Sequence, residues 1–283
     1  MSGFSSDWLA LREPFDLRAR NPQVLDAAVA ALADRLSVTI VDLACGTGST
    51  LRALAGRISA RQHWRLTDND LGLLLRASTT ARPERVNIST TPLDLARDLE
   101  AALDGGVDLV TTSALIDLVS TEWLERLAVE IAVRSLPIYL ALSYDGRIAL
   151  TPSDPGDAPI IAAVNAHQRT DKGFGSALGP AAAGEAIARF EGLGYAVTHG
   201  EADWVIGPSD RDMQMELLAG WASAARDVGG VSLAEAAGWL TRRRDAVTAA
   251  RSSIRVGHVD IFARPTTTRL ADRSQSSSRS LPS

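Results

Sequence analysis

Hydrophobic positions along the first half of the chain follow two alternating periods. Short apolar, β-branched runs, too brief for helices, read as buried strands and occur at residues 37–44, 64–68, 85–88, 107–112 and 137–143. Segments with apolar residues at helical spacing lie between them, at residues 22–36, 48–58, 71–78, 94–103 and 121–134. Strands that alternate with helices over so many units predict a parallel sheet covered by helices on both faces.

The pattern changes in the second half of the chain. Residues 145–179 are rich in Gly, Pro and Asp and predict a long connection. The elements expected after it are helices at 180–193, 210–226 and 232–249 and strands at 195–205 and 254–265. The expected organisation is an N-terminal helical segment at 1–36, one α/β domain at 37–266, and a Ser/Arg-rich disordered tail at 267–283.

Composition and charge narrow the class of protein. The net charge of −5 gives no sign of a broad phosphate-binding surface, so a nucleic-acid partner is not expected. The single cysteine, Cys45, rules out an internal disulfide and fits a reducing compartment. Neither a signal peptide nor an apolar run of membrane-spanning length is recognisable. These features predict a cytoplasmic protein without a membrane partner; they leave its oligomeric state open.

A turn of small residues follows the first predicted strand, in "VDLACGTGS" at residues 41–49. In an open parallel sheet such a turn lies at the carboxyl edge of the strands, where ligands bind. A phosphate-binding P-loop needs a lysine after its glycines, and "GTGSTLR" has none. A dinucleotide fold expects a third glycine where this chain has Leu51. The turn itself therefore leaves the ligand open, and the surrounding motifs decide it.

Four motifs in order resemble those of the class I S-adenosylmethionine-dependent methyltransferases. They are "VDLACGTGS", "WRLTDND", "TPLDLARDL" and "VDLVTTSALIDLVS", and they cover about residues 38–145. The family pattern usually has glycine where this chain has Ala44. "LREPFDLRAR" and "HQRTDKGFGSALGP" also resemble segments of a bacterial group within that family. The resemblance implies a doubly wound, Rossmann-like fold with a mostly parallel seven-stranded sheet, an antiparallel last strand and helical insertions at the cofactor edge.

The resemblance also implies S-adenosylmethionine as cofactor and gives its contacts. Asp68 matches the acidic residue that binds the ribose hydroxyls, and Asp94 matches the group that faces the adenine. Asp42 is expected near the amino end of the methionine. Either Arg12 or Arg18 is expected to hold its carboxylate, unless both arginines are solvated on a surface helix. The full set of expected cofactor contacts is Arg18, Asp42, Ala44, Cys45, Gly46, Gly48, Asp68, Asn69, Asp94, Leu95, Ser113 and Ala114.

The acceptor side is expected where two long insertions, 145–179 and 208–250, leave the same edge of the sheet. We expect them to form the lid and walls of a small-molecule pocket. His167 is a candidate general base, Asp117 is a second one, and Tyr144 is expected to orient the substrate. The alternative for His167 is a solvated loop, and for Asp117 a helix cap. No metal site is expected, because the histidines have no partners at ligand spacing.

The predicted function is methyl transfer to an oxygen or nitrogen of a small molecule by in-line displacement. "TTSALID" lacks the Pro-Pro-aromatic sequence of nucleic-acid amino-methyltransferases, and the Pro-Cys dipeptide of the cytosine type is absent from the chain. The alternative is a non-catalytic regulatory protein that binds S-adenosylmethionine. A nicotinamide-dependent reductase is disfavoured by Leu51.

Overall fold

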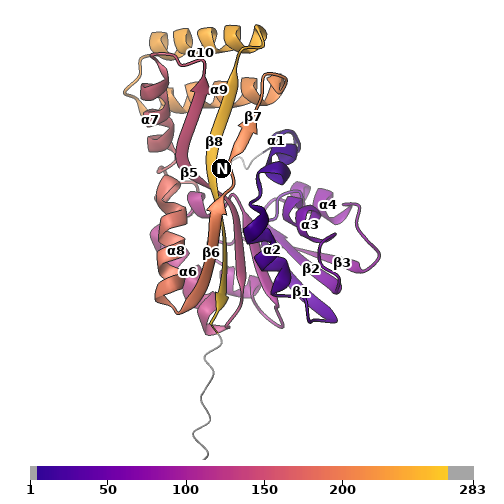
Figure 1. The fold of residues 1–283 in the computed structure, drawn as a ribbon. Helices are drawn as coiled ribbons and strands as arrows, with labels where there is room; N and C mark the ends of the chain where they lie inside the picture. The colour runs from indigo at the N-terminus through magenta and orange to yellow at the C-terminus, as the bar shows by residue number, and fades with distance from the viewer. Residues whose placement is uncertain (1–4, 267–283) are drawn as a thin grey trace, which may run out of the picture.

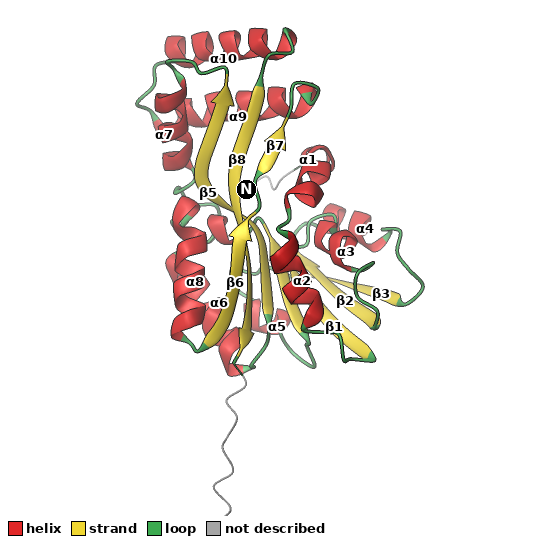
Figure 2. Cartoon of the chain, viewed as in Figure 1, coloured by secondary structure: helices red, strands yellow, loops and turns green. Residues whose placement is uncertain are grey.

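The computed structural model describes residues 5–266 of the 283, and Figures 1 and 2 show how they are arranged. The strands are β1 (Ser37–Leu43), β2 (Arg61–Asp68), β3 (Val86–Pro92), β4 (Leu109–Ser113), β5 (Ile138–Thr151), β6 (Tyr195–Glu201), β7 (Trp204–Ile206) and β8 (Ser253–Pro265). The helices are α1 (Ser6–Ala19), α2 (Pro22–Ala30), α3 (Ser49–Leu54), α4 (Leu71–Ser78), α5 (Leu99–Ala102), α6 (Thr121–Val133), α7 (Asp157–His167), α8 (Ala182–Gly192), α9 (Arg211–Val228) and α10 (Leu233–Thr248), with short 3-10 turns η1 (Ile116–Leu118) and η2 (Gly179–Ala181).

The strands form one mostly parallel sheet in the order β3-β2-β1-β4-β5-β8-β6, with β7 paired to β8. β1 pairs in parallel with both β2 and β4, so the strand order reverses at β1. β8 is antiparallel to β5, β6 and β7. This is the expected Rossmann-like methyltransferase fold, with eight strands in the place of seven. The carboxyl ends of β1, β2 and β4 meet at the crevice where such sheets bind ligands.

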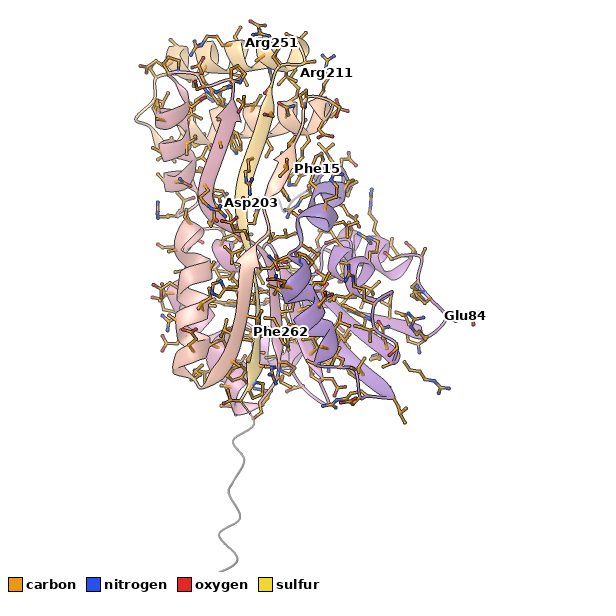
Figure 3. All side chains as sticks on the ribbon, viewed as in Figure 1. Phe15, Glu84, Asp203, Arg211, Arg251 and Phe262 are labelled. Carbon is orange, nitrogen blue, oxygen red and sulfur yellow. The ribbon has the colours of Figure 1, made fainter. Side chains whose placement is uncertain are left out.

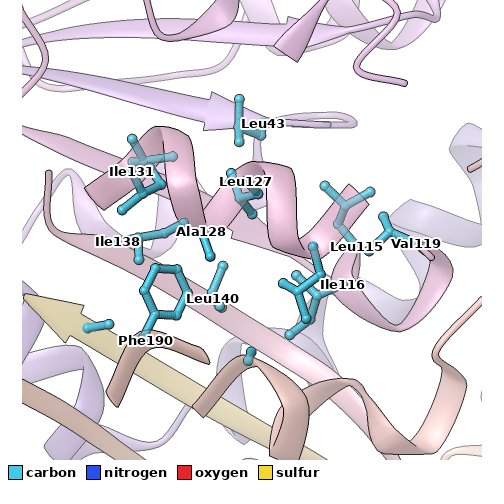
Figure 4. Close-up of a cluster of buried hydrophobic side chains, with 14 of the residues drawn as sticks. Leu43, Leu115, Ile116, Val119, Leu127, Ala128, Ile131, Ile138, Leu140 and Phe190 are labelled. Carbon is cyan, nitrogen blue, oxygen red and sulfur yellow. The ribbon is translucent and has the colours of Figure 1, made fainter. Parts of the chain in front are cut away.

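Helices cover both faces of this sheet because successive strand residues point to opposite sides. On one face, α6 and α8 contribute Leu127, Ile131 and Phe190, which pack against Ile138 and Leu140 of β5 (Figure 4). On the other face, α2, α3 and α4 pack against Ile40, Trp64 and Leu66. Strands buried on both faces read as continuous apolar runs, which is the pattern seen in the sequence.

A second layer of structure rises beyond the carboxyl edge of the sheet. β5 and β8 continue past it and pair from Ser143–Val259 to Thr151–Ser253, and Figure 1 shows both strands running into the upper part of the molecule. We call these paired segments, together with β7 and the helices α7, α9 and α10, the strand extension. It has its own apolar core, which includes Ile160, Trp204, Leu218, Trp239 and Val256.

The segment 145–179 differs from the long connection that its composition predicts. β5 runs on to Thr151, and α7 occupies Asp157–His167. The strand is stabilised by pairing with β8, more than a hundred residues away, and a local reading of the sequence cannot detect such a partner. The two insertions do meet, since α7 and α10 both pack against α9.

Two other elements differ from the expected ones. The single strand predicted at 195–205 is divided at Ala202–Asp203, where the Asp203 carboxylate accepts a hydrogen bond from the His258 backbone N–H. Of the helix predicted at 94–103, only Leu99–Ala102 is α-helical. The tail predicted at 267–283 lies outside the described residues. Within residues 5–266, no helix combines the length and apolar character needed to cross a bilayer.

Candidate functional site

The glycine turn after β1 is bent by left-handed residues at three alternate positions. Ala44, Gly46 and Gly48 have φ values of 50°, 54° and 85°. Such angles cost a side-chain-bearing residue free energy but not a glycine, which explains the glycines at two of the three positions. The Gly48 amide donates to the Cys45 carbonyl at 2.8 Å, and the Cys45 amide donates to Thr67 of β2 at 2.9 Å. The turn is therefore fixed to both strand ends.

Asp68 ends β2 and faces this turn. Its carboxylate accepts hydrogen bonds from the Gly46 amide at 2.9 Å and from the Asp70 amide at 3.0 Å. Burial raises its pKa above the usual aspartate value, and the two amides oppose that rise. Each carboxylate oxygen accepts one of these bonds and retains capacity for another donor. Asp68 thus presents a hydrogen-bond acceptor next to the glycine turn, where the sequence predicts it.

Asp42 is the last residue but one of β1 and is fully buried. The Thr111 hydroxyl, directly opposite on β4, donates to Oδ1 at 2.7 Å, whereas Oδ2 has no hydrogen-bond partner. Burial raises the pKa of Asp42 to about 7, and the nearby charge of Arg20 acts in the opposite direction. A buried carboxylate oxygen without a donor is rare in folded proteins and marks a position suited to a bound cation or donor.

Arg20, the residue that follows α1, was not identified from the sequence. It is 5% exposed and donates to the Tyr139 hydroxyl at 3.3 Å and to Thr50 at 3.4 Å. Arg12, Asp16 and Arg20 are spaced four residues apart, so they share one face of the helix, and this spacing was the available signal. Arg20 is the arginine of the N-terminal segment whose charge lowers the pKa of Asp42.

The two arginines expected near the methionine carboxylate have other contacts. The Arg18 guanidinium is exposed and stacks on the Phe15 ring with a centroid distance of 4.6 Å. The Arg12 guanidinium is buried and paired with Asp16 at 2.9 and 3.2 Å. Figure 3 shows Phe15 and Asp203 where α1 meets the strand extension. The assignment of Arg18 to the cofactor therefore gains no support from these contacts.

The loop after β3 lies next to Asp68, since the Leu93 amide donates to the Asp68 carbonyl at 3.0 Å. The Asp94 carboxylate is 45% exposed and accepts from the Ala96 amide at 3.1 Å, while Asn69 is exposed on the neighbouring loop. The Leu95 side chain, by contrast, is buried in the apolar core, so a cofactor contact from it is limited to its backbone. Leu95 is buried because its side chain packs under α6. The Trp123 indole of that helix donates a hydrogen bond to the Leu95 carbonyl.

β4 completes the crevice. Ser113 and Ala114 are partly exposed at its carboxyl end, and the Ala114 amide donates to Ala141 of β5 at 2.9 Å. The structure therefore brings the predicted residues of four segments to one edge of the sheet. These are Asp42, Ala44, Cys45, Gly46, Gly48, Asp68, Asn69, Asp94, Ser113 and Ala114.

Helix α1 covers the glycine turn. A Cβ on Gly46 would lie 3.3 Å from Cδ1 of Leu9, so the helix touches the turn directly. Glu13 of the same helix pairs with Arg52 of α3, and Arg52 also donates to the Thr47 hydroxyl at 3.2 Å. At its other side, α1 accepts a hydrogen bond from Trp204 of β7. The helix thus spans from the glycine turn to the strand extension.

Asp117 and Tyr144 lie together on the far side of the crevice. Asp117 is 6% exposed, and its Oδ1 has no hydrogen-bond partner. Burial raises the pKa of Asp117 to about 6, opposed first by its own backbone amide and then by Arg12 and the Tyr144 backbone amide. The Tyr144 hydroxyl donates to Oδ1 of Asn165 on α7 at 2.7 Å, and burial raises its pKa. Asp117 is a carboxylate whose ionisation lies near neutral pH, as proton transfer requires.

His167 is separated from this pair. It follows Asn165 by two residues on α7. Residues two positions apart in an α-helix are separated by about 200° around the helix axis, so His167 and Asn165 lie on nearly opposite faces of α7. Its Nδ1 is 3.4 Å from the Lys172 ammonium and its Nε2 is 4.0 Å from the Asp227 carboxylate. Burial and then the charge of Lys172 lower its pKa. The structure thus groups two of the three predicted acceptor-side residues and places His167 between Lys172 and Asp227.

Two other features bear on what the site can hold. A groove of about 370 Å³ on the strand extension is lined by Arg147, Arg255 and Asp203 among others, and its two arginines are already paired with Asp203. Among residues 5–266, there is no group of three or more His, Cys, Asp or Glu side chains suited to a metal ion. The unpaired polar groups of the crevice, Asp42 and Asp117, are therefore the stronger candidates for ligand contacts.

Comparisons with known proteins agree with this arrangement. Residues 40–135 match the family model described as a methyltransferase domain. No curated protein matches the chain. A cyclopropane-fatty-acyl-phospholipid synthase-like protein from Lactobacillus casei is 13% identical, with 92% of this chain and 94% of that one covered at a TM-score of 0.52. A cyclopropane synthase from Mycobacterium tuberculosis is 10% identical over 92% of this chain and 95% of its own, at 0.49. A methyltransferase from Thiobacillus denitrificans, in complex with S-adenosyl-L-homocysteine, is 15% identical over 92% and 99%, at 0.44. At these identities the structural likeness concerns the fold.

Proposed function

We propose that this chain, which belongs to the class I S-adenosylmethionine-dependent methyltransferase family, methylates an oxygen or nitrogen of a small molecule. It is a methyltransferase, and S-adenosylmethionine is its methyl donor. The nature of the acceptor and the roles of individual residues are our proposals.

The observation that carries the proposal is the pair of carboxylates beside the glycine turn. S-adenosylmethionine carries a sulfonium, an ammonium and a ribose diol but no phosphate. Asp68 is bonded to the Gly46 amide and retains acceptor capacity for the ribose hydroxyls. Asp42 has a buried oxygen without a donor, suited to the cationic end of the methionine. We assign Arg20, whose charge reaches Asp42, as the candidate partner of the methionine carboxylate.

The main requirement of the reaction is that the protein aligns the acceptor with the methyl group. The acceptor lone pair attacks the methyl carbon, the carbon–sulfur bond breaks, and its electrons remain on sulfur. A site therefore contributes by holding the two reactants in line and by excluding water. Ser113 and Ala114, at the end of β4, would border the transferred methyl group, as the family resemblance implies. The partial exposure of both residues is consistent with this role.

A small acceptor fits the way the crevice is enclosed. α1 lies on the glycine turn through Leu9 and reaches β7 through Asp16. The helices of the strand extension rise directly beyond the same edge. We infer that the acceptor binds between α1 and the strand extension, which together would act as lid and wall. Such an enclosed space suits a small molecule better than a duplex or a protein surface.

Calorimetric titration with S-adenosylmethionine and S-adenosylhomocysteine tests the cofactor assignment. We expect micromolar binding of both by the wild-type protein and its loss in Asp68→Ala. Asp98→Ala is the control, because Asp98 is exposed and caps no helix amide. Retained binding in Asp68→Ala would refute the ribose assignment. Incubation with tritiated S-adenosylmethionine and a metabolite extract tests transfer. Binding without any labelled product favours the non-catalytic alternative.

A further inference from the structure

Asp117 occupies a distinctive place relative to the predicted methyl position. It lies on η1, three residues beyond Ala114, on the chain that leaves β4. Its side chain is almost fully buried, and its Oδ1 has no hydrogen-bond partner. The role of helix cap considered for it is filled by another residue, since the Ser120 hydroxyl accepts from the Trp123 amide at the start of α6. Asp117 thus has an acceptor atom that the fold does not use.

Helix α1 brings a fixed positive charge toward this carboxylate. The Arg12 guanidinium is held by Asp16 through two hydrogen bonds of 2.9 and 3.2 Å. Asp16 in turn accepts from the Trp204 indole at 3.0 Å, and Arg12 lies 5.1 Å from the Trp204 ring centroid. The Trp204 ring stacks on His258, which faces Tyr144 across β8 and β5. Arg12 is therefore fixed between Asp16 of α1 and Trp204 of the strand extension, and the aromatic contacts through His258 connect this position to Tyr144.

The charges around Asp117 are few. Burial raises the pKa of Asp117, and its own backbone amide opposes this rise most, followed by the charge of Arg12 on α1 and then by the backbone amide of Tyr144 on β5. The 3-10 turn η2 and helix α8, which also pack against η1, supply no charge that shifts this pKa. Arg12 also acts on His258, whose pKa is lowered to about 3 by burial first and by Arg12 next. His258 is therefore neutral, and the local positive charge belongs to Arg12.

We propose that Asp117 takes the proton released by a hydroxyl or N–H acceptor, and that Arg12 is a positioning residue that keeps Asp117 ionised. This inference rests on the proposed methyl transfer. The acceptor's lone pair forms the new bond to the methyl carbon, and the sulfonium leaves as S-adenosylhomocysteine. The acceptor then carries one proton too many, and that proton goes to the free Oδ1 of Asp117.

A proton-accepting Asp117 limits the acceptors that need it to groups that carry a proton. A proton acceptor is needed for a hydroxyl or N–H group but has no role for a tertiary amine, which has no proton to release. Because Arg12 is part of α1, the same helix that covers the cofactor turn would also set the ionisation of the base.

The acceptor is not needed to test the electrostatic part. Protein labelled with ¹³C at the aspartate carboxyl carbons is titrated by NMR, and the Asp117 signal is assigned by its absence from Asp117→Asn. We expect a wild-type midpoint near pH 6 and an upward shift of roughly one pH unit in Arg12→Met. Arg226→Met, which removes an exposed arginine from α9, is the charge-matched control and should leave the midpoint unchanged.

Further variants control for misfolding of Arg12→Met. Arg12→Met leaves the buried Asp16 carboxylate without its arginine partner. The double variant Arg12→Met with Asp16→Asn removes both charges, and it is compared with the single variant Asp16→Asn, relative to which it should show the same upward shift. Arg12→Lys keeps the charge and should show little shift. Wild-type titration near the ordinary aspartate pKa of about 3.9 would overturn the proposal. An unchanged midpoint in the double variant relative to Asp16→Asn would overturn the role of Arg12.

The base role is tested by transfer of a tritiated methyl group from S-adenosylmethionine into a metabolite extract. We expect Asp117→Asn to lose on the order of a hundredfold or more in labelled product. Its calorimetric affinity for S-adenosylhomocysteine should remain at the wild-type value. Undiminished transfer by Asp117→Asn would refute the base role. Failure of wild-type protein to bind the cofactor would instead refute the proposed function, so the two failures are distinguishable.

Discussion

The carboxylate of Asp68 and the backbone amide of Gly46 are joined by a hydrogen bond of 2.9 Å, although 22 positions separate them in sequence. This bond ties the end of β2 to the glycine turn after β1, so the fold itself fixes the two sides of the proposed cofactor crevice relative to each other. The same carboxylate also accepts from the Asp70 amide. Binding and stability are therefore coupled at this residue.

Replacing Asp68 by alanine should reduce stability as well as binding. The substitution leaves two backbone amides, those of Gly46 and Asp70, without their acceptor. An unsatisfied amide costs about 1–3 kcal/mol when it stays buried, and water relieves part of this at the crevice. We expect Asp68→Ala to lower the free energy of unfolding in urea by roughly 1–3 kcal/mol. Asp98→Ala, on the surface, should change it by less than about 0.5 kcal/mol. Equal effects of the two variants would contradict the structural role.

Asp42 should make the fold less stable as pH rises. Its pKa in the folded protein is about 7, above the ordinary value of about 3.9. Between these values the folded state holds a proton that the unfolded chain has released, so the contribution of Asp42 to stability falls from about pH 4 to pH 7. Asp42→Asn removes this loss. We expect the variant to be more stable than wild type at pH 8, on the order of a few kcal/mol, and equal to it near pH 4.

Urea unfolding at both pH values measures that difference. A variant without a pH-dependent advantage would show that Asp42 does not titrate as the structure indicates. The same ionisation should appear in cofactor binding, because a bound sulfonium and ammonium favour the carboxylate form. Wild-type affinity for S-adenosylmethionine should therefore rise from pH 6 to pH 8 with release of a proton, detectable by calorimetry in buffers of different ionisation enthalpy. Asp42→Asn should bind more weakly and lose this dependence.

Two adjacent arginines of α10 provide a matched test of the strand extension. The Arg243 side chain is 2% exposed, pairs with Asp157 and donates to the Pro152 carbonyl at 2.6 Å. The Arg242 side chain is 54% exposed and pairs with Asp154 at 2.7 Å. Arg243→Ala leaves Asp157 with a partly uncompensated charge and should cost roughly 3–5 kcal/mol. Arg242→Ala should cost under about 1 kcal/mol.

Thermal and urea unfolding compare the two variants. The comparison holds helix, residue type and partner type constant, so a difference reports the burial of the ion pair. Similar losses of stability for both variants, or a larger loss for Arg242→Ala, would contradict the conclusion that the buried Arg243–Asp157 ion pair stabilises the packing of α10 on α7.

Helix α1 should be loosened by neutralising Glu13. Glu13 accepts from Nη2 of Arg52 at 2.7 Å, and Arg52 also contacts the glycine turn through Thr47. We expect Glu13→Gln to increase deuterium uptake by the α1 amides. S-adenosylhomocysteine should dissociate about two- to fivefold faster, as for a partly exposed pair worth roughly 0.5–1 kcal/mol.

Stopped-flow displacement measures the dissociation rate. The control is Asp26→Asn, which breaks the exposed Arg57–Asp26 pair away from the turn and should change neither quantity. Faster dissociation without any change in α1 exchange would point to an effect through Arg52 alone, and the role of α1 as cover would be wrong.

Local pattern predicted the elements of the main sheet because each depends on near neighbours. The expected helix at 71–78 is α4, and the apolar run before the glycine turn is β1. Asp42 and Asp68 could be placed at one edge because the carboxyl ends of parallel strands must meet there. Within the strand extension, α9, α10 and β8 match the elements expected at 210–226, 232–249 and 254–265. The continuation of β5 was not foreseen, since it depends on pairing with β8 far along the chain.

Periodicity and strand-end geometry are local properties, so the amino-acid pattern alone predicted the strands of the sheet, the glycine turn and the carboxylates at its edge. Which charges meet, in contrast, depends on the tertiary fold. It buried Arg20 near Asp42 and stacked Arg18 on Phe15, and it placed Arg12 and Tyr144 around Asp117 while α7 carried His167 elsewhere. Such groupings depend on contacts between residues tens to hundreds of positions apart. Burial, which sets the ionisation of these carboxylates, exists only once those contacts have formed.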